Sequence, residues 1–322
     1  MKKTKVLIIK IDSLDANQRI DNFLFKTYKK IPKSKIYKIL RTGEIRVNKK
    51  RIKPRYKLKT QDLIRIPPLR IVLKKKIKIN IKNKNQKKIK KSVLYEDKYI
   101  LIINKPSGIA VHSGSGIKYG IIEILRFKKS KNDFIELVHR IDKNTSGVLI
   151  LAKKKSILKM LQQQFLMKKI KKKYLTIVHG NWPKKKCFIN EPIQRKISQK
   201  NKKLVFIHKD GKTSKTYFKI IKKFKNFTLL AAYPITGRTH QIRIHASHIG
   251  HPILFDDRYG NKKIENFVNN KKIKKNILLH AYKIKFYHPK NKKKITIRAP
   301  LEKKFSDILD IIQKLNYNKI KI

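Results

Sequence analysis

Hydrophobic positions near the amino terminus follow a helical spacing twice and then alternate. In RIDNFLFKTY the apolar residues Ile20, Phe23 and Leu24 recur on one helical face. A second short helix is expected in SKIYKILRTG, ending at Gly43. EIRVN, which is followed by the turn NKKR, and later DLIRIPP alternate like strands. This pattern predicts a helix pair on a small sheet with a basic edge.

Further along the chain, apolar runs of strand length are separated by turns and short helices. The runs are YILII, VLILA, YLTIV, FTLLAAY, HQIRIH and KITIRAP. SILKMLQQQFLM differs, because its apolar residues share one helical face: Ile157, Leu158, Leu161, Phe165 and Leu166. Strands and helices mix without regular βαβ alternation. We therefore predict an α+β fold, with a mixed, mainly antiparallel sheet, flanking helices and a central cleft.

A lysine-rich stretch separates these two parts. Residues 74–92, KKKIKINIKNKNQKKIKKS, have few large apolar side chains and are typical of a charged, self-repelling linker. We expect a small domain at 19–80, a basic linker at 81–92 and a large domain at 93–322.

Charge narrows the choice of partner. The chain has 86 Lys and Arg against 19 Asp and Glu, a formal net charge of +67, which favours nucleic acid. Lysine dominates throughout, so compositional bias is an alternative source of part of this charge. The arginines cluster in residues 19–70 and 238–258, where a forked guanidinium suits RNA. No apolar run approaches the roughly 18 residues that span a bilayer, so no membrane partner is expected.

Several kinds of chemistry are disfavoured. The single Cys187 excludes an intramolecular disulfide and a multi-cysteine zinc site, and it suits the cytoplasm. HSGSGIKYG fits neither the P-loop nor the dinucleotide fingerprint. The histidines of HQIRIHASHIGH invite a metal, but if HQIRIH is a strand, His240 and His245 lie on opposite faces. We expect no metal, no cofactor and a monomer.

One carboxylate stands out in ELVHRIDKNTSGVLILAK, residues 136–153. Asp142 lies near Arg140, between the apolar runs LV and VLILA. In one interpretation it is an ordinary turn former whose side chain accepts hydrogen bonds from backbone amides. In the other it is partly desolvated at the edge of a core and needs a cation to stay ionised.

Five segments of the chain resemble one enzyme family. HRIDKNTSG resembles the HRLD-x-x-TSG signature of the RluA-type pseudouridine synthases. The segments NKPSGIAVH, KKKYLTIVHG, TGRTHQIRIHASHIGHPI and ILLHA resemble that family's other motifs, in the same order. RIDNFL, SKIY, EIRVN and QDLIRIP resemble an S4 RNA-binding domain, and FDDRYG with this domain is similar to the members that modify large-subunit ribosomal RNA. The departures are Ile141 for leucine, and Phe255 and Gln61 where relatives often have glycine.

The resemblance implies an S4-like domain at 19–80, a catalytic domain at 93–322, and isomerisation of uridine to pseudouridine without a cofactor. The N1–C1′ bond breaks, the uracil rotates, and C5 joins C1′. By the same resemblance Asp142 is the catalytic carboxylate, which attacks C1′ or removes the 2′ proton, and Arg243 pairs with it. Tyr174 stacks on the base and assists removal of the C5 proton, while Leu279 packs against the base and Arg140 fills the gap left by the flipped nucleotide.

Other interpretations stay open at this point. Without the resemblance, Tyr174 is an ordinary strand aromatic, Leu279 a core residue and Arg243 a phosphate ligand. The alternative function is a non-catalytic S4-type RNA-binding ribosome-assembly factor, and a weaker one is a metal nuclease. A pure binder has no need of the HRID motif.

Overall fold

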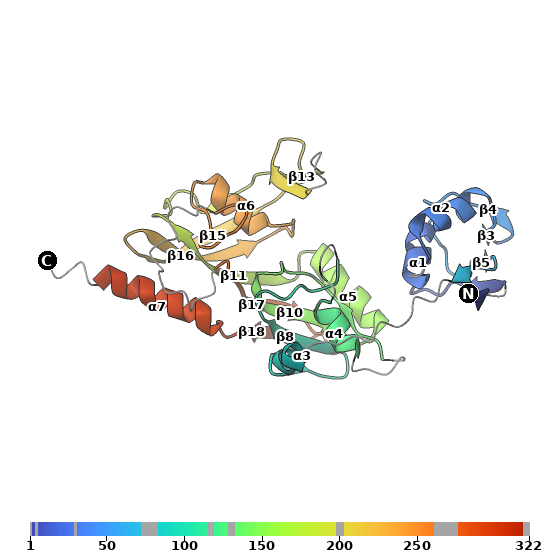
Figure 1. Cartoon of the computed structure of the whole chain (residues 1–322), viewed down its shortest axis with the longest axis horizontal. Coiled ribbons are helices and arrows are strands. Elements are labelled where there is room, and N and C mark those ends of the chain that lie inside the picture. The colour runs from blue at the N-terminus through green and yellow to red at the C-terminus, as the bar shows by residue number, and fades with distance from the viewer. Residues whose placement is uncertain are drawn as a thin grey trace. The chain divides into compact units, whose positions relative to one another are not determined.

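The computed structural model divides into two compact units, Met1–Asn80 (the N-terminal unit) and Ile81–Ile322 (the C-terminal unit). Figure 1 shows the chain coloured from blue to red along its sequence. The structure describes residues 2–3, 6–28, 31–71, 83–114, 117, 119–127, 133–197, 203–260 and 276–317.

The N-terminal unit is a helix pair with small antiparallel sheets. Its helices are α1 (Ile20–Thr27) and α2 (Lys33–Arg41). Its described strands are β1 (Lys2–Lys3), β2 (Leu7–Lys10), β3 (Arg46–Val47), β4 (Lys50–Arg51), β5 (Leu63–Ile66) and β6 (Arg70–Ile71), paired as β2-β5-β3-β4 and β1-β6. The apolar faces predicted for the two helices meet in one core, where Ile20, Leu24 and Ile36 are almost fully buried. The predicted helices and alternating strands of this part are confirmed.

Two residues that stand where relatives often have glycine adopt left-handed backbone. Gln61 has φ 73°, and Phe255, in the C-terminal unit, has φ 59°. Side chains in this region cost roughly 1–2 kcal/mol per residue, which glycine avoids. Gln61 N–H donates to the Ile11 carbonyl at 2.8 Å, which ties the turn before β5 to the residue that follows β2.

The C-terminal unit is built on one large mixed sheet. Its strands are β7 (Val93–Glu96), β8 (Ile100–Lys105), β9 (Glu136–Leu137), β10 (Ser146–Ala152), β11 (Lys171–His179), β12 (Phe188–Ile189), β15 (Thr216–Lys223), β16 (Phe227–Pro234), β17 (Leu279–Tyr287) and β18 (Lys294–Arg298). The order is β12-β15-β16-β11-β17-β10-β8-β7, with β18 on β17 and β9 on β10. Among the described strands only β10 and β17 pair in parallel. The predicted α+β class with a mainly antiparallel sheet is confirmed.

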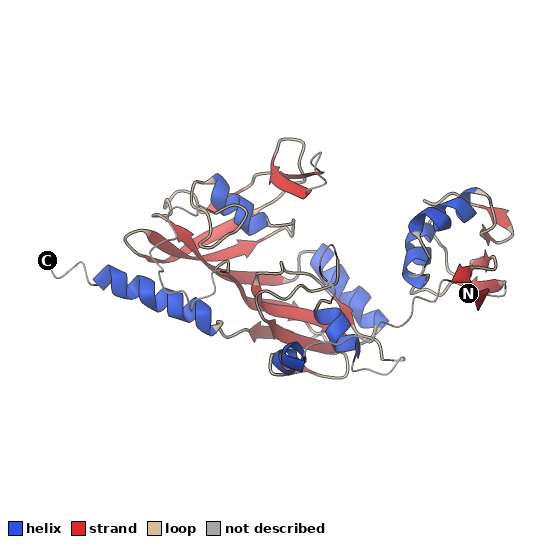
Figure 2. Ribbon diagram, viewed as in Figure 1, coloured by secondary structure: helices blue, strands red, loops and turns tan. Residues whose placement is uncertain are grey.

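Helices cover both faces of this sheet (Figure 2). The described helices of this unit are α3 (Asn83–Lys90), α4 (Ile121–Phe127), α5 (Lys155–Leu166), α6 (Gln241–His248) and α7 (Lys303–Tyr317), and a separate hairpin joins β13 (Ile193–Ile197) to β14 (Lys203–Ile207). Along β11, Ile177 packs in the cluster of α7 whereas the next residue, Val178, packs in the cluster of α6. Because successive strand residues face opposite sides, α6 and α7 cover opposite faces of this half of the sheet.

Three local expectations were wrong. HQIRIH, predicted as a strand, forms most of α6. Residues 241–246 are all buried, so this helix has no polar face that would produce a 3.6-residue pattern, and its short alternation mimics a strand. On α5, Leu166 is 82% exposed rather than part of the core face.

The third difference concerns the expected linker. Asn83–Lys90 is helical, and its Ile89 is 2% exposed, so this part of the stretch packs instead of extending as a charged chain. The remainder of the expected linker, residues 74–82, lies outside the described residues. No helix in the described ranges combines the length and apolar character needed to cross a membrane.

Candidate active site

All five residues predicted for the site line one pocket of about 180 Å³ in the C-terminal unit. Its lining comes from the loop before β10, from α5, from β11, from the end of β16 and the turn after it, from the start of α6, and from the first residue of β17. The polar and apolar side chains that line the pocket include Arg140, Asp142, Lys172, Tyr174, His240, Arg243 and Leu279.

The parallel strand pair places the carboxylate and the leucine at one end of the sheet. Asp142 lies four residues before β10 begins, and Leu279 is the first residue of β17. Parallel pairing of Gly147 with Ala281 brings these two starts side by side. A side chain at Gly147, which has φ 106°, would lie 2.4 Å from the Ala281 carbonyl oxygen, so glycine permits the close approach of the strands.

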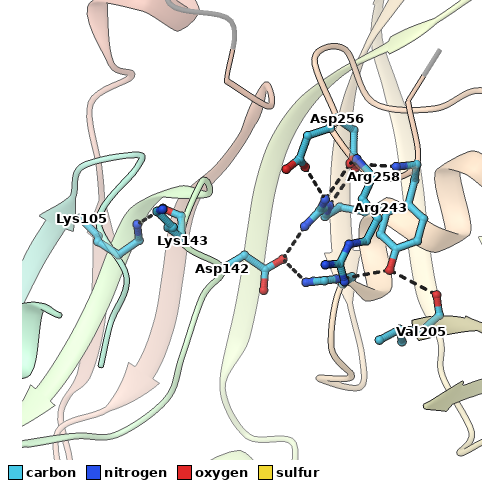
Figure 3. A network of polar contacts seen from close by, with 10 residues as sticks. Lys105, Asp142, Lys143, Val205, Arg243, Asp256 and Arg258 are labelled. Atoms are coloured by element: carbon cyan, nitrogen blue, oxygen red, sulfur yellow. Dashed lines mark hydrogen bonds and ion pairs between the residues drawn. The ribbon is translucent and has the colours of Figure 1, made fainter. Parts of the chain in front are cut away.

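A buried lysine holds the loop that carries Asp142. Lys105, at the end of β8, is 0% exposed. Its ammonium donates to the carbonyl oxygens of Pro106 and Ile109 at 2.8 Å and of Lys143 at 3.0 Å. Burial lowers the pKa of Lys105 to about 7, against the opposing charges of Glu302 and Asp142. Figure 3 shows this lysine contacting Lys143, next to Asp142.

Arg243 faces Asp142 from the opposite side of the pocket (Figure 3). Its Nη1 lies 3.4 Å from Asp142 Oδ2, although the two residues are 101 positions apart. Asp256 binds the same guanidinium through both oxygens, with Nε–Oδ2 at 2.8 Å and Nη2–Oδ1 at 2.6 Å. Asp257 lies 3.2 Å from Nη2 but is 72% exposed on its side chain, whereas that of Asp256 is 0% exposed. Arg243 is therefore oriented mainly by Asp256.

The electrostatics keep Arg243 and Asp256 charged. Burial opposes the charge of Arg243, but the hydrogen bonds and charge of Asp256, with the charges of Asp142 and Asp257, raise the pKa of Arg243 overall. Burial likewise tends to raise the pKa of Asp256, but the hydrogen bonds from Arg243 outweigh it, and the pKa of Asp256 is lowered. A permanent cation thus faces Asp142, whose side chain is 23% exposed.

His240 also faces the carboxylate, in a fixed orientation. It adopts the left-handed conformation, with φ 54° and ψ 19°, immediately before α6. The Tyr259 hydroxyl donates to the Val205 carbonyl at 3.2 Å and so accepts from His240 Nδ1–H at 2.9 Å. His240 Nε2, 3.8 Å from Asp142 Oδ2, then carries the lone pair in the neutral ring. Burial lowers the pKa of His240, with Arg243 and Arg258 adding to the effect against Asp142.

Tyr174 and Leu279 form apolar walls of the pocket. The register between β11 and β17 shifts around Tyr174, so this residue sits at a bulge, a feature that re-aims side chains beside active sites. Burial, and next the charge of Asp142, raise the pKa of Tyr174, which keeps the phenol protonated. Leu279 is 4% exposed. Arg140 is exposed and also lines a neighbouring hollow with the predicted loop residues His112 and Gly114.

Sequence reasoning missed several partners of these residues. The motifs FDDRYG and NKPSG contain Asp256 and Lys105, for which no catalytic role was predicted, and no contact between His240 and Asp142 was predicted. The family motifs that contain these residues were the signal that could have identified them. Within the described ranges, no group of three or more His, Cys, Asp or Glu side chains is arranged to hold a metal ion. The arrangement offers one carboxylate opposite a fixed cation, in a pocket with aromatic and aliphatic walls.

Known sequences similar to this chain belong to RNA-modifying enzymes. The family model "RNA pseudouridylate synthase" matches residues 99–248, and the model "S4 domain" matches residues 18–64. The chain is similar to ribosomal large subunit pseudouridine synthase C of Buchnera aphidicola subsp. Acyrthosiphon pisum, with 53% identity over 95% of this chain and 98% of that protein. It is also similar to the protein of the same name from Vibrio parahaemolyticus, with 46% identity over 98% of this chain and 99% of that protein.

Solved structures share the fold. Human RNA Pseudouridylate Synthase Domain Containing 4 matches with a TM-score of 0.58 and 22% identity, over 72% of this chain and 96% of that one. Human RNA Pseudouridylate Synthase Domain Containing 1 matches with a TM-score of 0.53 and 20% identity, over 69% and 94%. At these identities the likeness supports the architecture alone.

Proposed function

We propose, for a chain that belongs to the RNA pseudouridylate synthase family, that it isomerises uridines to pseudouridines in large-subunit ribosomal RNA. The near full-length similarity to large-subunit enzymes supports this substrate. The observation that carries the chemistry is the Asp142–Arg243 pair across the pocket. An RNA-binding factor without activity has no use for a carboxylate paired with a fixed cation in such a pocket.

Asp142 acts on the sugar of the target nucleotide. A carboxylate can open the N1–C1′ bond by attack on C1′ or by removal of the 2′ proton, and both routes require the ionised form. Arg243 places a positive charge beside Asp142, and Lys105 positions the loop through the Lys143 carbonyl. A glycosidase uses a second carboxylate to direct water. Here water must be excluded, because hydrolysis would release the uracil.

The walls of the pocket hold the flipped base. Extracting a base from folded RNA costs a few kcal/mol, and stacking on an aromatic ring returns roughly 1–3 kcal/mol per base. Tyr174 supplies that ring, and Leu279 packs against the other side of the base. The raised pKa of Tyr174 favours this stacking role, since a phenol accepts a proton poorly. Arg140, exposed at the pocket, is placed to fill the gap in the RNA stack.

The N-terminal unit supplies affinity for RNA. Basic and aromatic side chains gather around a hollow on α2 and the β4 hairpin, namely Tyr37, Lys38, Arg41, Arg51 and Lys53. Cations of this kind bind phosphates independently of sequence, so binding should weaken with salt. A ribosomal RNA substrate supports a location in the cytoplasm. We expect the protein to work as a monomer without a metal.

Release of tritium from large-subunit ribosomal RNA transcribed with 5-tritiated uridine tests this function. The wild-type protein should release tritium, because C5 loses its hydrogen when it joins C1′. The isosteric variant Asp142→Asn should release none while binding the same RNA in a filter assay. Equal release by both proteins would refute the catalytic role of Asp142. Binding without release by the wild type would instead favour the assembly factor, and loss of release in a chelator would favour metal chemistry.

A further inference from the structure

Lys172 is a cation of the pocket for which the mechanism above has no use. It lies on β11, two residues before Tyr174, and both residues line the pocket. Its ammonium donates to the Thr236 carbonyl at 3.3 Å. Within the described residues no carboxylate pairs with it. Burial alone lowers the pKa of Lys172, to about 8.

The contrast with the other cations near Asp142 is informative. The charge of Asp142 acts on Arg243, Lys105 and Tyr174, but it makes no resolved contribution at Lys172. Lys172 lies two residues from Tyr174 on β11, and the ion pairs of Asp142 among the described residues are with Arg243 and His240 rather than with Lys172. Lys172 is half-buried. A cation partly removed from water without a counter-ion is costly, and such a group in a pocket indicates a functional site.

The neighbours of Lys172 leave its charge available. His139, which also lines the pocket, accepts a hydrogen bond on Nε2 from the Ile150 N–H at 3.1 Å. Burial and then the charge of Lys172 lower the pKa of His139 to about 3, so the imidazole is neutral. Tyr174 stays a neutral phenol. An anion that forms between Tyr174 and Lys172 would thus meet one positive charge on this wall.

The proposed reaction produces such an anion. When the N1–C1′ bond breaks, its electron pair moves to the uracil, and the negative charge spreads from N1 to the two carbonyl oxygens, O2 and O4. With C1′ at Asp142 and the ring against Tyr174, the uracil extends toward Lys172. A preorganised donor aimed at developing charge is among the strongest catalytic devices in a site closed to water.

We propose that Lys172 is a catalytic residue whose ammonium donates a hydrogen bond to a carbonyl oxygen of the departing uracil and stabilises the uracil anion. The inference rests on the isomerase function proposed above. No proton leaves Lys172: the electron pair returns to carbon when C5 bonds to C1′, C5 loses its proton, and N1 gains one. Lys172 differs from Arg243 in this scheme, because Arg243 serves the carboxylate and Lys172 serves the leaving group.

Lys172→Met tests the proposal, and Lys171→Met is the matched control. Methionine keeps the length of the side chain and removes the charge, and Lys171 is the exposed neighbour on the same strand. Loss of a charge-assisted hydrogen bond should lower the single-turnover rate of tritium release about 10- to 100-fold in Lys172→Met, with little change in KM. Lys171→Met should keep the wild-type rate.

A better leaving group should rescue the variant. Fluorine at C5 stabilises the uracil anion, so a transcript containing 5-fluorouridine needs the ammonium less. Because fluorine leaves no C5 proton to be lost after C5 joins C1′, the quantity compared is the single-turnover rate of N1–C1′ cleavage, followed as loss of 5-fluorouridine in nuclease digests by chromatography. The ratio of this rate between wild type and Lys172→Met should be several-fold smaller on this transcript than on the uridine transcript. This comparison is internal to each folded protein, so a loss of active enzyme cancels.

The pH profile provides a third measurement. The wild-type rate should fall as the pH rises above about 8, where Lys172 loses its proton, and this fall should be missing from the profile of Lys172→Met. Lys105, whose pKa is about 7, titrates in both proteins, so the difference between the two profiles is what tests Lys172. The lowered pKa values of His139 and His240 and the raised pKa of Tyr174 keep these groups neutral from pH 7 to 9.

Three outcomes would overturn the proposal. The first is an unchanged kcat in Lys172→Met. The second is a raised KM as the sole defect of this variant, which would make Lys172 a phosphate ligand. The third is an equal rate ratio of wild type to variant on the two transcripts. Failure of the wild type itself to release tritium would refute the isomerase function instead, so the two ideas are separable.

Discussion

Replacing Asp256 by asparagine should both destabilise the C-terminal unit and slow its chemistry. In the folded protein the fully buried Asp256 carboxylate accepts two hydrogen bonds from Arg243, at 2.8 and 2.6 Å, and its Oδ1 also accepts from the N–H groups of Arg258 and Tyr259. Asparagine keeps one acceptor but turns an amide N–H₂ toward a guanidinium, which is itself a pure donor. One buried charge then loses its main partner.

The structure sets the size of the effect. Hydrogen bonds to charged groups contribute about 1.5–3 kcal/mol each, and removing one partner of a buried ion pair costs about 3–5 kcal/mol. We therefore expect Asp256→Asn to lower the free energy of unfolding by about 3–5 kcal/mol. The catalytic rate should fall about tenfold or more, equivalent to roughly 1.4 kcal/mol in the barrier, because Arg243 is no longer held toward Asp142.

Asp257→Asn is the matched control, since Asp257 also lies against Arg243 Nη2, at 3.2 Å, but is 72% exposed on its side chain. Exposed pairs contribute about 0–1 kcal/mol. Urea unfolding can be followed by the fluorescence of Trp182, the single tryptophan of the chain. Trp182 is 1% exposed, its ring centroid lies 4.7 Å from that of Phe218, and both residues belong to the core cluster that includes residues of α6. Equal stability and equal tritium release in the two variants would refute the orienting role of Asp256.

Two further predictions concern the lysine under the catalytic loop and the basic face of α2. Lys105→Met should lower stability by roughly 3 kcal/mol or more, because three buried carbonyl groups lose their donor. The folded pKa of Lys105, about 7, lies below the unfolded value, so the folded state binds fewer protons. The free energy of unfolding in urea of the wild type, relative to that of Lys105→Met, should therefore increase from pH 7 toward 10. A decrease of this difference would contradict the burial of this ammonium. Lys38→Ala with Arg41→Ala should weaken binding of ribosomal RNA and reduce the slope of log affinity against log salt by about 0.7–0.9 per lost phosphate contact. An unchanged slope in filter binding would show that these residues do not contact phosphate.

Much of the fold was predictable because its patterns are local. The helix faces of Ile20 and Ile36, the strand runs such as VLILA, and the absence of βαβ alternation are all properties of short windows. The segment HQIRIH failed for the same reason: α6 is buried around its first two turns, so its window contains no polar side that would reveal a helix. The order of strands in the sheet was not predicted, since pairing partners carry no local signature.

The five candidate site residues were also predictable, but through the family motifs rather than from their own chemistry. Tyr174 and Leu279 have no feature that separates them from core residues until the pocket is seen. The structure brought these five together, and their roles stay predictions that the variants above test. The motif HRIDKNTSG by itself indicated a carboxylate in apolar surroundings; it did not indicate what keeps that carboxylate charged.

The sequence by itself determined the composition of the site: a single acid in HRID, a forked cation in THQIR, and strands and helices whose apolar faces require a core. Only the tertiary structure decided who contacts whom. Arg243 contacts Asp142, which is 101 residues away in the sequence, and Asp256 binds the same guanidinium through two hydrogen bonds. Lys172 lies in the same pocket as Tyr174, and among the described residues no carboxylate pairs with it. The physical reason is that hydrophobic periodicity acts over a few residues, whereas charge, burial and hydrogen bonding depend on distances that exist only after the sheet has closed the pocket.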